Sequence, residues 1–85
     1  MSMEVRFVEW IDSMGGSNWT PLEDVRTTRP MHIYTAGFVA DEDDDYVTIL
    51  QSFDERKDGR PHGDNYICIP KFAIKSSRTL EEPSE

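Results

Sequence analysis

Five consecutive acidic residues at positions 41–45, reading DEDDD, are the part of the sequence that most resembles a chemical site. Alternating carboxylates open a calcium-binding loop, but that loop needs glycine at its sixth position and a bidentate glutamate at its twelfth. Here those positions hold Tyr46 and Ser52. His32 and His62 have no second ligand at a spacing typical of a metal site. The sequence therefore predicts no metal ion and no other cofactor.

Serine, histidine and aspartate are all present, but not in the arrangements that make them catalysts. The sequence has no nucleophile elbow, and no histidine is paired with the single cysteine, Cys68. Residues 15–17, reading GGS, lack the lysine that would complete a phosphate-binding loop. Carboxylate pairs carry little information in a chain this acidic. We therefore expect a protein that is not an enzyme.

The acidic run is followed directly by the apolar, β-branched segment 46–50, a position typical of a turn between two strands. Two interpretations stay open: a solvated hairpin tip, and a surface that meets a basic partner protein. In the second, the carboxylates complement the partner's charge, and nearby aromatic rings are the buried anchors. The candidate partner-binding residues are Asp41, Asp43, Asp44, Asp45, Tyr46 and Trp19.

A second candidate site lies in the polar loop 54–64, which concentrates positive charge in an otherwise acidic chain. It is either a solvated hairpin tip or a contact for an anion, since arginine and lysine side chains bind phosphate groups. The second interpretation gains force if subunits bring several such loops together. In that alternative, an oligomer of the chain sequesters a nucleotide or another small anion through Arg56, Lys57, Arg60 and His62.

The composition limits the class of partner. The 85 residues include 17 acidic and 9 basic side chains, which give a formal net charge of -8. Because nucleic-acid backbones and anionic membranes are bound by clustered lysine and arginine, we expect neither as a direct partner. No apolar run approaches the roughly 20 residues of a membrane span. The N-terminal residues do not resemble a signal peptide, and Cys68 can form no disulfide within one chain. These features predict a protein of the reducing cytoplasm.

Hydrophobic patterning predicts a single small β-barrel domain over residues 1–80 and a disordered acidic tail at 81–85. Gly37 interrupts the second strand, which is typical of the bend by which small barrels curl their sheets. Closing the sheet would remove its exposed edges and would let a short chain cover its core. The five expected strands are residues 5–11, 31–40, 46–53, 65–69 and 74–80.

Two short helical turns are expected between these strands. Thr20 precedes Pro21 and Glu23 as an N-cap precedes the first turn of a helix. A second single turn is expected at residues 70–73, just before the last strand. Trp10 lies within the first strand and is expected in the core.

Two segments resemble parts of Sm-like and SH3-like small barrels. The pattern I-x-x-x-G-x-V that begins at Ile33, with the acidic turn and residues 46–50, is similar to their bent second strand, turn and third strand. The pattern I-P-x-x-x-I that begins at Ile69, followed by Leu80, is similar to the strand, single helical turn and strand that close them. The resemblance implies a five-stranded barrel. It does not extend to RNA binding, because the asparagine after the turn and the basic loop before the last strand are both missing.

The whole pattern also resembles small proteins of tailed phages and prophages. These open with a V-x-W-x-D strand, here starting at Val8, continue with a loop that carries a tryptophan, here Trp19, and end in an I-P-x-x-x-I-K-S segment, here starting at Ile69. The resemblance implies a phage accessory protein of counter-defence or host takeover, located in the cytoplasm of the host cell. We therefore expect a non-catalytic binding protein that inhibits a host macromolecule, with a basic host or phage protein as its partner. A structural role in the virion is the remaining alternative.

Overall fold

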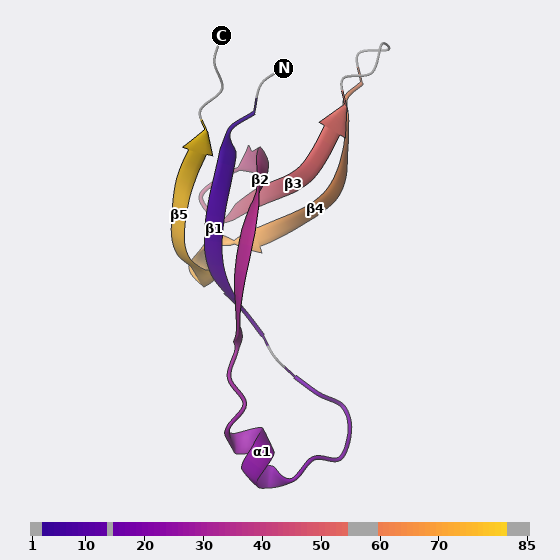
Figure 1. Ribbon diagram of the computed structural model, residues 1–85, viewed down its shortest axis with the longest axis vertical. Helices are drawn as coiled ribbons and strands as arrows, with labels where there is room; N and C mark the ends of the chain where they lie inside the picture. Colours follow the sequence, from indigo (N-terminus) through magenta and orange to yellow (C-terminus); the bar gives the residue numbers. More distant parts are fainter. Residues whose placement is uncertain (1–2, 14, 55–59, 82–85) are drawn as a thin grey trace.

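The computed structural model describes residues 3–13, 15–54 and 60–81, and it shows a mainly β fold (Figure 1). Five antiparallel strands form one sheet in the order β4-β3-β2-β1-β5. A short helix, α1 (Leu22–Arg26), lies between β1 and β2, and a 3-10 turn, η1 (Lys71–Ala73), lies between β4 and β5. The strands are β1 (Val5–Asp12), β2 (Met31–Glu42), β3 (Tyr46–Asp54), β4 (His62–Pro70) and β5 (Ile74–Glu81). The predicted mainly β fold of five strands and short helical turns is confirmed. No helix in the described part of the chain is long and apolar enough to cross a membrane.

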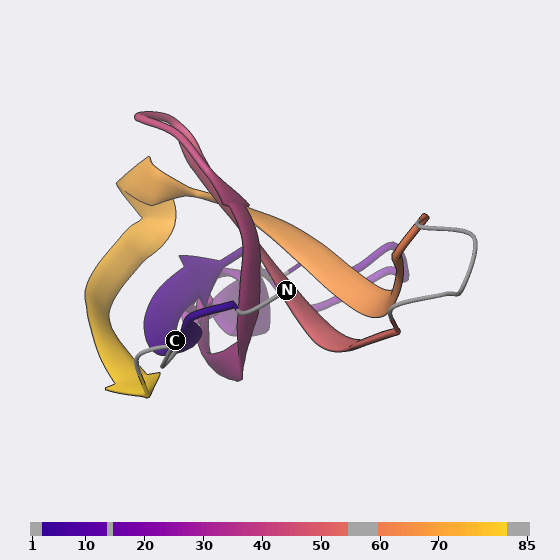
Figure 2. The same ribbon diagram turned by 90° about the horizontal axis from the view of Figure 1, so that it is seen from above.

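The sheet stays open, which corrects the expectation of a closed barrel. β4 and β5 lie at its two edges, and no pairing joins them within the described residues. Figure 2 shows the two strands leaving η1 in different directions. The strand register gives a physical reason why the sheet does not close. The residues of β5 opposite Arg6 and Val8 are the polar residues Thr79 and Ser77. Closing the sheet over such polar side chains would remove them from water and bury little apolar surface.

A small core lies on one face of the curled sheet. Its buried apolar side chains come from β1, β3 and β4 and are Val8, Trp10, Val47, Ile49 and Ile69. The indole Nε1 of Trp10 donates a hydrogen bond to Thr35 Oγ1 at 3.0 Å. That bond offsets the cost of burying the one polar atom of the ring. The prediction that Trp10 belongs to the core is confirmed.

β2 and β3 approach each other closely at Gly37. A Cβ atom at this position would lie 2.6 Å from the backbone oxygen of Leu50 and 2.8 Å from Cγ2 of Ile49. Because no side chain tolerates such distances, the close approach requires glycine. The register of the two strands shifts just beyond this point, between Val39 and Asp41. The structure thus agrees with the bend predicted for the second strand.

Replacing Gly37 by alanine is expected to destabilise the fold by about 2 kcal/mol, because the new methyl group overlaps with backbone atoms that cannot move aside. Unfolding in denaturant, followed by circular dichroism, measures the change. Gly16→Ala is the matched control, since nothing lies within 4 Å of the Cβ position of Gly16. Equal stabilities of the two variants would contradict the close approach of the strands.

Residues 13–30, which we call the arm, connect β1 to β2. The described residues among them, 13 and 15–30, project from the sheet and include α1 (Figure 1). The arm begins and ends beside Asp12 and Met31, which face each other in the β1–β2 ladder. No residue of α1 is buried. The radius of gyration is 16.9 Å, whereas a compact chain of this length has about 12 Å. The N-cap of α1 is Pro21 and makes no side-chain cap, so the predicted cap at Thr20 is wrong.

Candidate functional site

The acidic run lies where β2 turns into β3, as predicted, and Asp43 shapes this turn. Its Oδ1 accepts hydrogen bonds from the backbone N–H groups of Asp45 and Tyr46, both at 2.8 Å. The N–H of Asp43 in turn donates to the carbonyl of Tyr46 at 2.9 Å. The N–H of Asp45 first, and that of Tyr46 second, lower the pKa of Asp43 because they stabilise its charged form. Asp43 therefore holds the turn together and is less available to a partner than its neighbours.

Glu42 is bound by two cationic side chains. The guanidinium of Arg6 donates from Nη1 to Oε2 at 2.8 Å and from Nη2 to Oε1 at 2.9 Å. The Nζ of Lys71 lies 2.9 Å from Oε2 of the same carboxylate. The hydrogen bond from Arg6 first, and that from Lys71 second, lower the pKa of Glu42 from 4.5 to about 2. The end of β2 is thereby tied to β1 and to η1.

Arg6 also binds a second carboxylate, that of Glu4. Its Nε donates to Oε2 and its Nη2 to Oε1, both at 2.8 Å, and Thr79 Oγ1 donates to Glu4 as well. The hydrogen bond from Arg6, followed by that from Thr79, lowers the pKa of Glu4, and the two carboxylates raise the pKa of Arg6. Only 14% of the Arg6 side chain is exposed, so solvent screens these pairs less than typical surface pairs. We call this cluster the ion-pair network; it consists of Glu4, Arg6, Glu42 and Lys71.

Glu42→Gln is expected to lower the free energy of unfolding at neutral pH by about 1 kcal/mol, the upper end of the range for a partly exposed ion pair. Because folding lowers the pKa of Glu42 from 4.5 to about 2, its contribution is complete above pH 4.5 and is lost as the pH falls through 2. The difference between the wild type and the variant should therefore shrink over this interval. Denaturant unfolding at a series of pH values measures it.

Asp44→Asn is the control for this experiment. Asp44 makes no side-chain hydrogen bond or ion pair with any described residue, so its replacement should leave the stability near that of the wild type. A Glu42→Gln difference that stayed constant from neutral pH to pH 2 would contradict the assigned role of the network.

An exposed surface, which we call the acidic corner, lies beside the network at the tip of the β2–β3 hairpin. It consists of Asp44, Asp45, Tyr46 and Phe72. These residues, together with Pro70 and Lys71, line a shallow depression between the hairpin tip and η1. The backbone N–H of Lys71 donates to the carbonyl of Asp45 at 2.8 Å, and Figure 2 shows the tip lying next to the β4–β5 corner. The hairpin is therefore held in place at both the backbone and the side-chain level.

The negative charge of the hairpin is only partly neutralised. Asp41, Asp44 and Asp45 are exposed, and no described residue donates a hydrogen bond to their carboxylates or forms an ion pair with them. Asp41 lies further back on β2, opposite Thr48. Lys71, the cationic residue beside these carboxylates, forms its ion pair with Glu42. Three of the candidate carboxylates are thus solvated and available to a basic partner.

Phe72 is a residue of this surface that the sequence reasoning missed. Its side chain is 92% exposed, and that of Tyr46 beside it is 50% exposed. Ile69 and Ile74 pack toward the core on either side of η1. A turn of three residues between two inward-facing side chains must direct a side chain outward. In the sequence, the aromatic residue between Ile69 and Ile74 is the signal that could have indicated an outward-facing ring at this position.

The structure does not bring Trp19 together with the acidic corner. Trp19 lies on the arm and is fully exposed. It lines a separate depression that is formed by arm residues alone, whereas the acidic corner belongs to the sheet. The arm extends away from the sheet along the longest axis of the molecule (Figure 1). The exposed aromatic ring that lies beside the acidic turn is that of Phe72, not that of Trp19.

The alternative anion site falls partly outside the described residues, because Arg56 and Lys57 are not among them. His62 donates from Nδ1 to the carbonyl of Arg60 at 2.6 Å, and its backbone N–H donates to Asp54 Oδ1 at 3.3 Å. His62 lines a depression that is also lined by the carboxylates of Asp54 and Asp64. The anion site stays a prediction.

Among the described residues, no three histidine, cysteine, aspartate or glutamate side chains are grouped so that they could hold a metal ion. His32 lies 3.4 Å from Glu9, with Nε2 facing Oε2, and its ring is tilted against that of Tyr34. His32 therefore contacts neighbouring side chains of β1 and β2 on the surface of the sheet.

No family model matches the chain, and neither a curated protein nor a solved structure is significantly similar to it. The resemblance to phage proteins therefore stays a prediction from the sequence.

Proposed function

We propose that this chain is a non-catalytic binding protein that occludes a basic surface of a macromolecular partner with its acidic corner. The observation that carries the proposal is the position of Phe72. A phenylalanine ring that is 92% exposed stands beside solvated carboxylates on a hairpin that is fixed by ion pairs. Exposed aromatic rings surrounded by charge are typical anchors of protein interfaces.

The charges support a basic protein as the partner. Asp41, Asp44 and Asp45 are left without a neutralising side chain among the described residues, and the whole chain has a net charge of -8. Such a field attracts a basic surface over distances of about 10 Å and repels nucleic-acid backbones. Association is therefore fast and strongly salt-dependent, and the aromatic contact slows dissociation.

The ion-pair network supports the same role by holding the surface rigid before binding. Arg6 and Lys71 fix Glu42, and the N–H of Lys71 fixes the carbonyl of Asp45. A surface that is already ordered loses little conformational entropy when the partner binds. The acidic corner therefore needs no rearrangement to present Tyr46 and Phe72.

The sequence resemblance to phage accessory proteins supports a host macromolecule as the target. In this proposal the protein acts in the cytoplasm of the host cell, and it blocks a groove of a defence or housekeeping protein that normally meets acidic ligands. Occlusion of such a groove requires no chemistry from the bound protein.

The proposal predicts that the immobilised chain captures a basic protein from a bacterial extract and releases it as the salt concentration rises. Asp41→Asn, Asp44→Asn and Asp45→Asn together should weaken this binding and flatten its salt dependence, because they remove the attracting charges. Phe72→Ala should weaken it about 30-fold at every salt concentration, which is typical for the loss of an aromatic anchor. Mass spectrometry identifies the captured protein, and surface plasmon resonance measures its affinity.

The matched control removes three charges from described, exposed residues outside the acidic corner, at Glu23, Asp24 and Asp64. This control variant should keep most of the affinity for the partner, because it loses the same net charge as the triple aspartate variant but has an intact acidic corner. Equal losses in the control and in the triple aspartate variant would mean that only net charge matters. An affinity unaffected by Phe72→Ala would remove the corner from the interface.

A further inference from the structure

The arm is an insertion that the sheet itself does not need. Asp12 and Met31 are direct partners in the β1–β2 ladder, and two residues suffice to connect such a pair. Residues 13–30 exceed the roughly 15 residues beyond which a loop in a small domain usually has a function of its own. Ordering a segment of this length costs conformational entropy that burial must offset. In the isolated chain that burial is missing.

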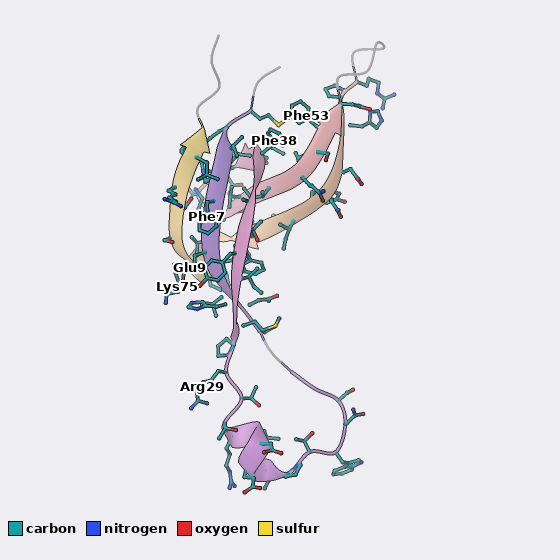
Figure 3. The ribbon with its side chains drawn as sticks, in the orientation of Figure 1. Phe7, Glu9, Arg29, Phe38, Phe53 and Lys75 are labelled. Carbon is teal, nitrogen blue, oxygen red and sulfur yellow. The ribbon has the colours of Figure 1, made fainter. Side chains whose placement is uncertain are left out.

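The apolar side chains of the arm face solvent. Trp19 is 104% exposed, Leu22 63% and Val25 50%. A helix as short as α1 has little stability of its own in water. Figure 3 shows the side chains of the arm, including Arg29, standing clear of the sheet. The arm therefore offers an apolar surface that requires a partner.

The accessible surface area of the chain also indicates that part of its surface is covered by a partner. It measures 6822 Å², whereas a compact monomer of this mass exposes about 5200 Å². A standard interface removes about 800 Å² from each partner, so an excess of about 1600 Å² per chain is twice that amount and corresponds to the larger interface of an obligate dimer. A chain of this size gains that burial most directly from a second copy of itself, since each copy presents the same excess.

A receiving surface for the arm exists on the same chain, where β2 and β3 diverge. Within the described residues, β3 pairs with β2 only from Phe38 to Glu42 and touches it at Gly37, so residues 31–36 have a free edge on that side. The rings of Phe38 and Phe53 meet edge-on, with centroids 5.1 Å apart, and join the strands next to the point of divergence (Figure 3). Beyond it lies an opening that we call the split.

The split is lined by apolar and uncharged polar side chains. Tyr34 on β2 and Tyr66 on β4, which are 61% and 75% exposed, line it, and on its β3–β4 side Asn65 donates a side-chain hydrogen bond of 2.7 Å to Gln51. None of the described residues that line it is charged, although 31% of the chain is charged. Aromatic side chains without charges are characteristic of the centre of an interface.

We propose that two copies of this chain associate by exchanging arms, with the arm of each copy seated in the split of the other. Two chains of net charge -8 repel each other, so association is restricted to surfaces that carry no net charge. The arm satisfies this condition, because Glu23 and Asp24 are balanced by Arg26 and Arg29. The split satisfies it because the described residues that line it are uncharged.

The exchange uses the free backbone edge as well as the side chains. The described residues of the arm before α1, 13 and 15–21, have neither helix nor strand. Apart from the N–H of Ser13 and the C=O groups of Asn18 and Pro21, which are already hydrogen-bonded, their backbone groups can pair with the edge of β2 at residues 31–36. Adding an extended segment to a free strand edge is a common mode of association. Trp19, Leu22 and Val25 then pack against Tyr34 and Tyr66 of the other copy. The arrangement is reciprocal, as a two-fold axis requires.

Static light scattering of the full chain tests the proposal. The wild type should show twice the mass of one chain. Trp19→Ala combined with Leu22→Ala should weaken self-association at least about 30-fold, because buried tryptophan anchors dominate such interfaces. Tyr66→Glu, on the receiving side, should weaken it similarly, and its exposed position leaves the fold intact. Phe72→Ala is the control and should keep the doubled mass, since Phe72 lies in the acidic corner.

Two further samples separate arm exchange from other modes of pairing. A chain in which Asn-Gly replaces residues 13–30 should keep the circular dichroism of a β-sheet and show the mass of one chain. A mixture of the arm variant with Tyr66→Glu retains one intact arm–split contact, so native mass spectrometry should detect a mixed dimer above the level of either variant alone.

A full-length chain that scatters as a monomer at high micromolar concentration would overturn the proposal and would assign the arm to a different protein. A doubled mass that survives removal of the arm would overturn it as well. A dimer that is lost with the arm but kept in Tyr66→Glu would refute the split as the receiving surface. None of these results depends on the acidic corner, so the proposed function is tested separately.

Discussion

The backbone contact between β2 and β3 at Gly37 decides the shape of the whole sheet. Toward Glu42, β2 leaves this contact paired with β3 and forms the acidic hairpin. Toward Met31, it is paired only with β1 and leads to the arm. The contact is possible only without a side chain, since a Cβ atom would lie 2.6 Å from the backbone oxygen of Leu50. Both the hairpin of the acidic corner and the split beyond it are consequences of this one approach.

The five residues of the acidic run differ in whether their carboxylates are bound by other groups of the protein. Adjacent carboxylates repel one another, at about 1 kcal/mol or less for each exposed pair. Arg6 and Lys71 neutralise Glu42, and backbone N–H groups stabilise Asp43, so the repulsion is relieved at the two residues that hold the turn. The remaining three side chains, of Asp41, Asp44 and Asp45, are exposed and have no ion-pair partner among the described residues. The structural role of Glu42 and Asp43 is therefore compatible with the binding role proposed for the other three residues of the run.

The open sheet and the thin core explain why so much apolar surface is exposed. A chain of this length buries only about 60% of the surface of its unfolded form, and here β5 presents Ser77 and Thr79 where a closed barrel needs apolar side chains. The described chain therefore places large hydrophobic side chains on the arm, on the outer strands and at η1. Binding to the native state alone would stabilise such a fold by mass action.

Much of the architecture can be predicted from the sequence, because it depends on local pattern. The five strands follow from β-branched and aromatic segments between turn residues, the bend follows from Gly37, and the turn follows from the acidic run before residues 46–50. The burial of Trp10 follows from its place in an apolar strand. Each of these features is determined by residues close together in the chain.

Which residues form the proposed binding surface cannot be predicted from local sequence pattern. Arg6 and Glu42 are 36 positions apart, and their pairing decides which carboxylates stay free. The exposure of Phe72, the separation of Trp19 from the hairpin and the open edge of the sheet likewise depend on how distant strands meet. Side chains alternate between the two faces of a strand, so a shift of one residue in register reverses which of them meet. Local pattern sets the strands and turns of this protein, and the register between distant strands sets which side chains a partner can reach.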